Sequence, residues 1–325
     1  FSYDLVGTGA SFPYQFLKIA FEDYSNKHNL TINYNPTGSK NGFESLKKQE
    51  VDFSAVDMFL NDKLINSFPY PKDIIHVPIC ISGIGIGYNV KNIKNLNLTA
   101  KVLSEILIKK ITNWNDKKIQ KLNPKIKLPN LEIVVILRKG GSGSTYLLTQ
   151  YLSKLNSLWK LSFGKSLEIN FPGCILANNS SHMQKLLSQI PGSIGYVGYS
   201  YKKNNNFQFA AIENLRGNFI KPTIDSISNA ANITLPKDSR ASMINSNSNN
   251  GYPISSFSWI ITYKNQNYNK RNKQKLIDLQ NLLKWLTTDA QKLTTKAGYS
   301  PLPNNVREIA TNILDTMTYK KIKNQ

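Results

Sequence analysis

Residues 138–144 combine the chemical groups that bind a small anion. An apolar run from Leu131 to Leu137 predicts a buried strand, and Arg138, a turn rich in Gly and Ser and a helical pattern of leucines follow it. The first backbone N–H groups of a helix have no intrahelical acceptor, small residues let an oxyanion approach them, and the Arg138 guanidinium offers a planar set of donors. The segment therefore predicts an anion-binding turn. Three small residues stand at the predicted helix start: Ser142, Gly143 and Ser144.

Two other chemistries share this strand–turn–helix pattern. A P-loop needs a Lys after its last glycine to reach the phosphates of a nucleotide, and no Lys stands there. A nucleophile elbow reads G-x-S-x-G, whereas this turn ends in Ser144 and no His or Asp partner motif accompanies it. Both hydrolytic chemistries are therefore disfavoured, and a capped helix start without a ligand remains the alternative.

The same construction occurs twice more near the N-terminus. Tyr3 to Gly7 predicts a strand, and Ser11 and Phe12 follow it just before a helical pattern of apolar residues. A second strand, Thr31 to Asn35, leads into a turn that contains Ser39. Three predicted helix starts thus carry small hydroxyl residues.

One acidic residue stands beside these predicted donors. The alternating segment from Val51 to Val56 predicts a strand, and Asp57 follows it directly. A fixed carboxylate repels an anion unless the ligand brings a proton for a hydrogen bond. Phosphate near neutral pH keeps a proton and sulfate does not, so Asp57 predicts a preference for phosphate. The alternative is that Asp57 is an ordinary turn acid or helix cap.

These residues lie within longer motifs that resemble those of periplasmic phosphate-binding proteins, the substrate-binding components of phosphate ABC transporters. Gly7–Pro13 is similar to the family's G-A-G-A-[ST]-F-P, Thr37–Gly42 resembles its G-S-S-G-G turn, and Val51–Asp57 resembles its V-D-F-G-A-S-D strand. Further matches follow along the chain: Val77-Pro78, Tyr88-Asn89, Ile111–Asp116, Pro191–Val197, Tyr252–Ile254 and Gly298–Pro303.

The resemblance implies an α/β, two-lobed periplasmic-binding-protein (Venus-flytrap) fold that closes on phosphate between its lobes. Lobe one is expected to hold residues 1–83 and 257–325 and lobe two residues 84–256, with crossing hinge strands near 82–89 and 252–260. The family's phosphate contacts fall on eight residues: Ser11, Phe12, Ser39 and Asp57 in lobe one, and Arg138, Ser142, Gly143 and Ser144 in lobe two.

Two departures from the family pattern stand next to these contacts. The family commonly has an Asp two residues after the Arg, where it steadies the guanidinium, and this chain has Gly140. Arg138 is therefore expected to be less rigid or to find another partner. Lys40 and Asn41 replace the usual Ser and Gly, which predicts a positive charge at the rim of the cleft.

The resemblance also implies what the protein does. It is expected to bind inorganic phosphate with high affinity, to deliver it to the permease subunits of an ABC importer, and to perform no chemistry, without any cofactor. A periplasmic or extracytoplasmic location is implied, with a leader and perhaps a lipoprotein anchor removed, and the protein is expected to act as a monomer. A binder of sulfate or molybdate is the main alternative, and a phosphate-ester hydrolase is a weaker one.

Composition agrees with this interpretation. A chain of 325 residues can form two domains, and segments 101–110, 183–190 and 276–293 predict amphipathic helices that alternate with strands. The scattered histidines and the distant Cys80 and Cys174 predict no metal site.

The net charge is high: 41 basic and 20 acidic residues give +21. This charge suggests nucleic acid, but the lysines are dispersed, no nucleic-acid-binding motif accompanies them, and no specific nucleic-acid partner is expected. The coding bias of an AT-rich genome is a simpler explanation for the many lysines than a nucleic-acid partner is. Attraction of anions or of acidic lipid headgroups is the functional alternative.

Overall fold

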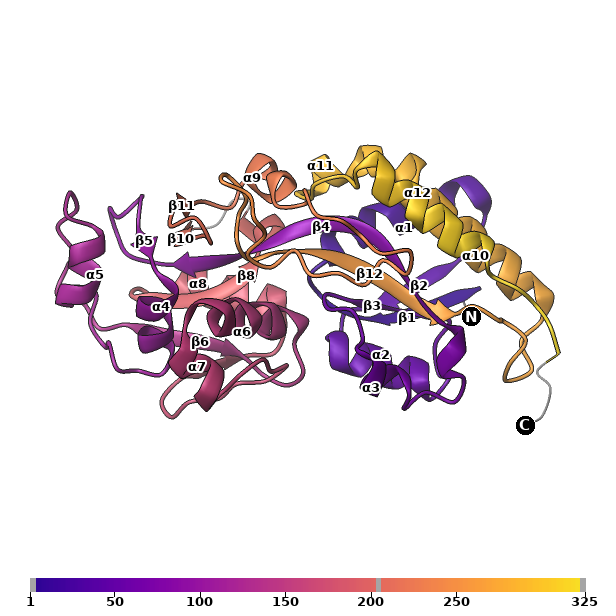
Figure 1. Ribbon diagram of the computed structural model, residues 1–325, viewed down its shortest axis with the longest axis horizontal. Helices are drawn as coiled ribbons and strands as arrows, with labels where there is room; N and C mark the ends of the chain where they lie inside the picture. The colour runs from indigo at the N-terminus through magenta and orange to yellow at the C-terminus, as the bar shows by residue number, and fades with distance from the viewer. Residues whose placement is uncertain (1–3, 203–205, 322–325) are drawn as a thin grey trace. The chain divides into compact units, whose positions relative to one another are not determined.

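The computed structural model describes residues 4–202 and 206–321. The chain divides into two compact units. Unit 1 holds the chain up to Ile81, the segment Thr234–Ser242 and the chain from Phe257 onward, and unit 2 holds Ser82–Ile233 and Met243–Ser256. Figure 1 shows both units and labels most of their helices and strands.

Unit 1 is built on a mixed sheet. Its strand order is β2 (Ile32–Asn35), β1 (Leu5–Gly9), β3 (Phe53–Val56), β12 (Ser255–Tyr263) and β4 (Ile74–Tyr88). Strand β1 is parallel to β2 and β3, while β12 is antiparallel to β3. Because β1 and β3 are parallel, with Gly9 opposite Ala55, the residues that follow both strands lie at the same edge of the sheet.

Helices cover both faces of this sheet. Figure 1 shows α1 (Tyr14–His28), α10 (Lys273–Thr287) and α12 (Asn304–Asp315), whose apolar residues share one core with Phe53 and Ala55. Ser54 points to the opposite face, because successive side chains of a strand alternate. There α2 (Ser39–Lys47) approaches so closely that a Cβ added to Gly42 would lie 2.3 Å from Ser54 Oγ. Unit 1 also contains the short helices α3 (Asp62–Ile65) and α11 (Thr294–Ala297).

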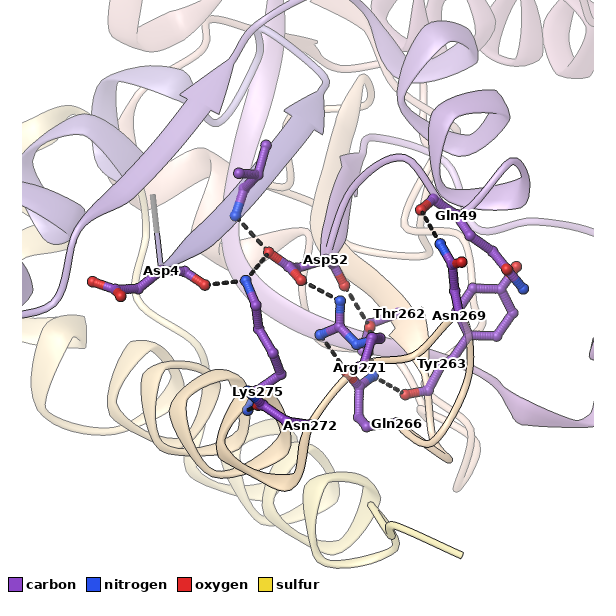
Figure 2. Close-up of polar contacts among 11 residues, drawn as sticks. Asp4, Gln49, Asp52, Thr262, Tyr263, Gln266, Asn269, Arg271, Asn272 and Lys275 are labelled. Atoms are coloured by element: carbon purple, nitrogen blue, oxygen red, sulfur yellow. Dashed lines mark hydrogen bonds and ion pairs between the residues drawn. The ribbon is translucent and has the colours of Figure 1, made fainter. Parts of the chain in front are cut away.

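A buried polar network ties the start of α10 to the sheet (Figure 2). The Asp52 carboxylate is buried, forms an ion pair with Arg271, and accepts hydrogen bonds from Val6 N at 2.7 Å and Lys275 Nζ at 3.3 Å. Arg271 Nη2 donates in turn to Gln266 Oε1 at 2.7 Å. The network thus joins β1, the residue before β3 and the loop that leads into α10.

In unit 2 the strand order continues from β4, and helices flank these strands. Strand order is β4, β8 (Ser193–Gly198), β6 (Val134–Arg138) and β7 (Ile175–Ala177), with β9 (Gln208–Phe209) also paired to β4. Strand β6 is parallel to both β7 and β8. A small sheet is formed by β11 (Phe219–Ile220), β10 (Ala211–Glu213) and β5 (Asn97–Leu98). The helices are α4 (Ala100–Leu107), α5 (Lys117–Leu122), α6 (Gly143–Leu155), α7 (Ser157–Ser162), α8 (Ser180–Gln189) and α9 (Ile224–Asn229).

The observed division differs from the expected one at Ser82 and Gly83, which belong to unit 2, and in one inner segment. Residues 84–256 were expected to form lobe two, but Thr234–Ser242 belongs to unit 1. Ser239 Oγ donates to the carbonyl of His76 at 2.7 Å, and Arg240 forms an ion pair with Asp62 at 2.8 Å. These contacts hold the segment on unit 1. Two further unit boundaries fall inside strands: one inside β4, after Ile81, and one inside β12, before Phe257.

Candidate functional site

The turn after β1 carries Ser11 and Phe12, both buried. Ala10 N donates to the carbonyl of Ala55 at 2.8 Å, and its own carbonyl accepts from Tyr34 OH at 2.7 Å. The hydroxyl of Tyr299 donates to the carbonyl of Phe12. Strand β3 and two tyrosines therefore fix the backbone of this turn before α1 begins at Tyr14.

The second turn places Ser39 at the first position of α2, fully buried. Gly38 adopts φ of 103°, a conformation open to glycine, and its N–H donates to the carbonyl of Gly9 at 2.7 Å. The two turns are therefore joined directly. Ser39 Oγ accepts a hydrogen bond from Asp57 N at 3.3 Å, which leaves the hydroxyl proton to donate to another acceptor. Lys40, the next residue, is exposed.

Asp57 follows β3 and is only 2% exposed. Burial raises the pKa of the Cys80 thiol of β4, and the negative charge of the Asp57 carboxylate raises it further. A buried carboxylate is costly unless hydrogen-bond donors surround it. Unit 1 thus brings together a carboxylate, two serines and the N–H groups of two turns at one edge of its sheet.

Unit 2 holds Arg138 at the carboxyl end of β6, with 3% of the residue exposed. Arg138 Nη1 donates to Ser180 Oγ at 3.3 Å, and Arg138 N donates to Tyr196 OH at 3.0 Å. The same phenol shares a 2.7 Å hydrogen bond with Thr145 Oγ1. Burial raises the pKa of Tyr196, against the opposing effects of the Thr145 and Arg138 hydrogen bonds, so the phenol stays neutral near pH 7.

The Tyr196 hydroxyl connects Arg138 to Thr145, which lies in the first turn of α6. Ser142 is the N-cap, and its Oγ accepts from Thr145 N at 3.3 Å. Its own N–H donates to the carbonyl of Leu167 at 2.8 Å. Ser142, Gly143 and Ser144 are all buried, and the N–H groups at such a helix start carry the positive end of the helix dipole.

The structure therefore collects the eight predicted residues into two groups. Unit 1 contains Ser11, Phe12, Ser39 and Asp57, and unit 2 contains Arg138, Ser142, Gly143 and Ser144. We call these the unit 1 half-site and the unit 2 half-site. Over residues 4–202 and 206–321, no cluster of three or more His, Cys, Asp or Glu residues has a metal-binding arrangement.

Ser180 and Tyr196 were not among the predicted site residues. At Gly140, φ is 73° and a Cβ would meet no atom within 4 Å, so the turn itself supplies no support for Arg138 there. Support comes from the neighbouring strands, because Ala177 of β7 lies opposite Arg138 and Tyr196 belongs to β8. In the sequence, Asn179-Ser180 between a short strand and a helical pattern signals a helix start, but not a contact with Arg138.

Comparison with known proteins gives the class and then the family. Residues 2–290 match the family model of a PBP superfamily domain. A structure of a high-affinity periplasmic phosphate-binding protein with bound phosphate superposes with a TM-score of 0.74 at 17% identity, covering 98% of this chain and all of that one. An ABC-type phosphate transport receptor from Vibrio cholerae superposes with a TM-score of 0.59 at 19% identity, covering 92% and 100%. The chain thus has the two-lobed α/β fold of periplasmic binding proteins.

Comparison with a related sequence identifies the family within this class. The phosphate-binding protein PstS of Xylella fastidiosa is 30% identical over 311 residues, which cover 94% of this chain and 83% of that protein. This chain belongs to the family of PstS phosphate-binding proteins.

Proposed function

We propose that this protein binds inorganic phosphate reversibly and delivers it to an ABC-type phosphate importer, and that both half-sites contact one phosphate ion. The observation that carries the proposal is the pairing of chemistries: one buried half-site contains a carboxylate and hydroxyls, and the other contains an arginine and a helix start. Eight residues would contact the ion: Ser11, Phe12, Ser39, Asp57, Arg138, Ser142, Gly143 and Ser144.

Each group has a distinct role in this proposal. Arg138 and the N–H groups at the start of α6 supply positive potential to the ligand oxygens. Ser39 donates its hydroxyl proton, since its lone pair already accepts from Asp57 N. Asp57 accepts a hydrogen bond from the protonated oxygen of phosphate and repels a fully ionised sulfate or molybdate.

The proposed role is binding without turnover. Hydrolysis of a phosphate ester needs a nucleophile or an activated water, and we assign no residue of either half-site to that task. We further propose that the protein acts outside the cytoplasm as a monomer, held at the membrane by a lipid anchor, with the permease subunits as partners.

Isothermal titration with phosphate and sulfate tests the proposal. The wild-type chain is expected to bind phosphate and to reject sulfate. Arg138→Ala is expected to weaken phosphate binding by about 3 kcal/mol or more, because it removes the charged partner of a buried anion. Asp57→Asn is expected to raise sulfate affinity relative to phosphate, because the amide can donate to an oxygen that carries no proton.

Lys40→Gln is the matched control, because it removes an exposed charge next to the buried Ser39. It should change affinity by less than about 1 kcal/mol. Equal binding of phosphate and sulfate by the wild type would show that a different oxyanion site is present. Release of phosphate from a chromogenic ester would favour the hydrolase alternative.

A further inference from the structure

Helix α7 exposes an apolar surface that the phosphate half-sites do not use. Leu158 is 69% exposed and Leu161 is 83% exposed, and Phe163, directly after the helix, is 42% exposed. Leu158 and Leu161 are three positions apart, so they share one side of the helix. Isolated exposed apolar residues are ordinary, but three within six positions form a patch of the kind that marks a docking surface. We call Leu158, Leu161 and Phe163 the α7 patch.

A well-packed base holds this patch in place. Trp159 is buried, and its ring lies 4.9 Å from that of Phe163, which lies 5.1 Å from Phe171. Asn156 caps α7 by accepting from Leu158 N and Trp159 N, and its Nδ2 donates to Ser104 Oγ of α4 at 2.7 Å. The leucines are therefore presented outward by a helix that is fixed to its neighbours.

Lysines lie close to the α7 patch. A hollow of about 460 Å³ is lined by Leu158 and Phe163 together with Lys101 and Lys110, while Lys160 lies between Leu158 and Leu161 in sequence and Lys165 follows Phe163. Among the described residues that line this hollow, the acidic Glu105 forms an ion pair with Lys118.

The wider region of unit 2 is also strongly basic. Residues 91–129 contain ten lysines and two acidic residues, a net charge of 10 − 2 = +8 out of +21 for the chain. All ten basic residues are lysine, whose compact, strongly hydrated charge suits a diffuse anionic surface more than bidentate recognition.

We propose that the α7 patch docks on an anionic phospholipid bilayer. The two leucines and Phe163 insert at the boundary between headgroups and acyl chains, and the surrounding lysines attract the lipid phosphates. This composition differs from that of protein interfaces, which are depleted in Lys and rely on Trp, Tyr and Arg as anchors. Here the tryptophan is buried beneath the patch, and aliphatic side chains are outermost.

Vesicle flotation tests the proposal with the whole chain. Wild-type protein is expected to float with vesicles of phosphatidylglycerol and phosphatidylcholine, to float about tenfold less with phosphatidylcholine alone, and to be released by salt. The double variant Leu158→Ser, Leu161→Ser should lose about tenfold in partitioning, because it removes the inserted hydrocarbon. Lys160→Gln with Lys165→Gln should weaken binding to the anionic vesicles alone.

The matched control is Leu215→Ser with Ile277→Ser, which removes two exposed apolar residues elsewhere, 53% and 41% exposed. It should float like the wild type. Every variant should keep wild-type phosphate affinity by titration, which separates this inference from the proposed function and reports correct folding.

Absence of flotation by the wild type, or unchanged flotation of the α7 double variant, would overturn the proposal. If that variant still floats but fails to stimulate the ATPase of a reconstituted importer, the patch docks on protein and the lipid assignment is wrong.

Discussion

The way Arg138 is held differs from the pattern expected for its family. An acid two residues later would fix the guanidinium and offset part of its charge, but Gly140 has no side chain to do so. Ser180 Oγ, a neutral acceptor, contacts Nη1 instead, and Tyr196 fixes the backbone of Arg138. A neutral oxygen orients the guanidinium without itself offsetting the positive charge.

Removal of this hydroxyl should therefore weaken phosphate binding. We expect Ser180→Ala to lower phosphate affinity by about 0.5–1.5 kcal/mol, roughly three- to tenfold, because the buried donor on Arg138 loses an acceptor. Ser180→Thr, which keeps the hydroxyl, should bind more tightly than the alanine variant in the same calorimetric titration.

Ser181→Ala serves as the control for that experiment, because Ser181 is the next residue of α8 and is exposed. It should bind like the wild type. Affinity of Ser180→Ala within twofold of wild type would mean that Ser180 does not position Arg138.

At the scale of elements, local sequence signals predicted the strands and helices that carry the proposed site residues. The predicted strand Leu131–Leu137 corresponds to β6, which begins later, at Val134, because Ile133 N donates to Thr112 O outside the main sheet. The predicted strand Tyr3–Gly7 corresponds to β1, Leu5–Gly9, and Tyr3 lies outside the described residues. Periodicity fixed the type of each element, whereas tertiary hydrogen bonds fixed its ends.

For helices too, the sequence pattern predicts the element but not the residue at which it begins. The pattern predicted a helix at 183–190, and α8 begins at Ser180 because Asn179 accepts from His182 N at 2.8 Å. The contact between Ser180 and Arg138 depends on this earlier start and on β7 lying next to β6. Strand order is a long-range property, so no local pattern in the sequence could reveal that contact.

The Asp52 network makes a prediction about the attachment of α10 (Figure 2). Asp52→Asn should lower the free energy of unfolding by about 3 kcal/mol, because Arg271, whose side chain is 11% exposed, would keep a buried charge without its carboxylate partner. Urea denaturation measures this change. Asp23→Asn, which breaks the exposed pair with Lys27, is the control and should cost less than about 1 kcal/mol. Equal effects would show that the network adds no specific stability.

At the scale of the whole chain, three distant segments of unit 1 meet at His76. This residue of β4 is buried, and its Nε2 accepts a hydrogen bond from Leu60 N at 3.0 Å. Its carbonyl accepts from Ser239 Oγ of the segment Thr234–Ser242. Burial and, to a lesser extent, the positive charge of Arg240 lower the pKa of His76 to about 3, against the opposing effect of Asp238. His76 is therefore a neutral structural link between these segments.

This lowered pKa makes stability depend on pH. Above the ordinary pKa of 6.5 both the folded and the unfolded chain hold a neutral His76, whereas between 6.5 and about 3 the unfolded chain gains a proton that the folded chain excludes. The free energy of unfolding should therefore fall by about 1.4 kcal/mol for each pH unit below 6.5, or about 2 kcal/mol at pH 5. In phosphate-free urea titrations His76→Gln should lose most of this slope, while His28→Gln should retain it. An unchanged slope in His76→Gln would place the acid sensitivity in other groups.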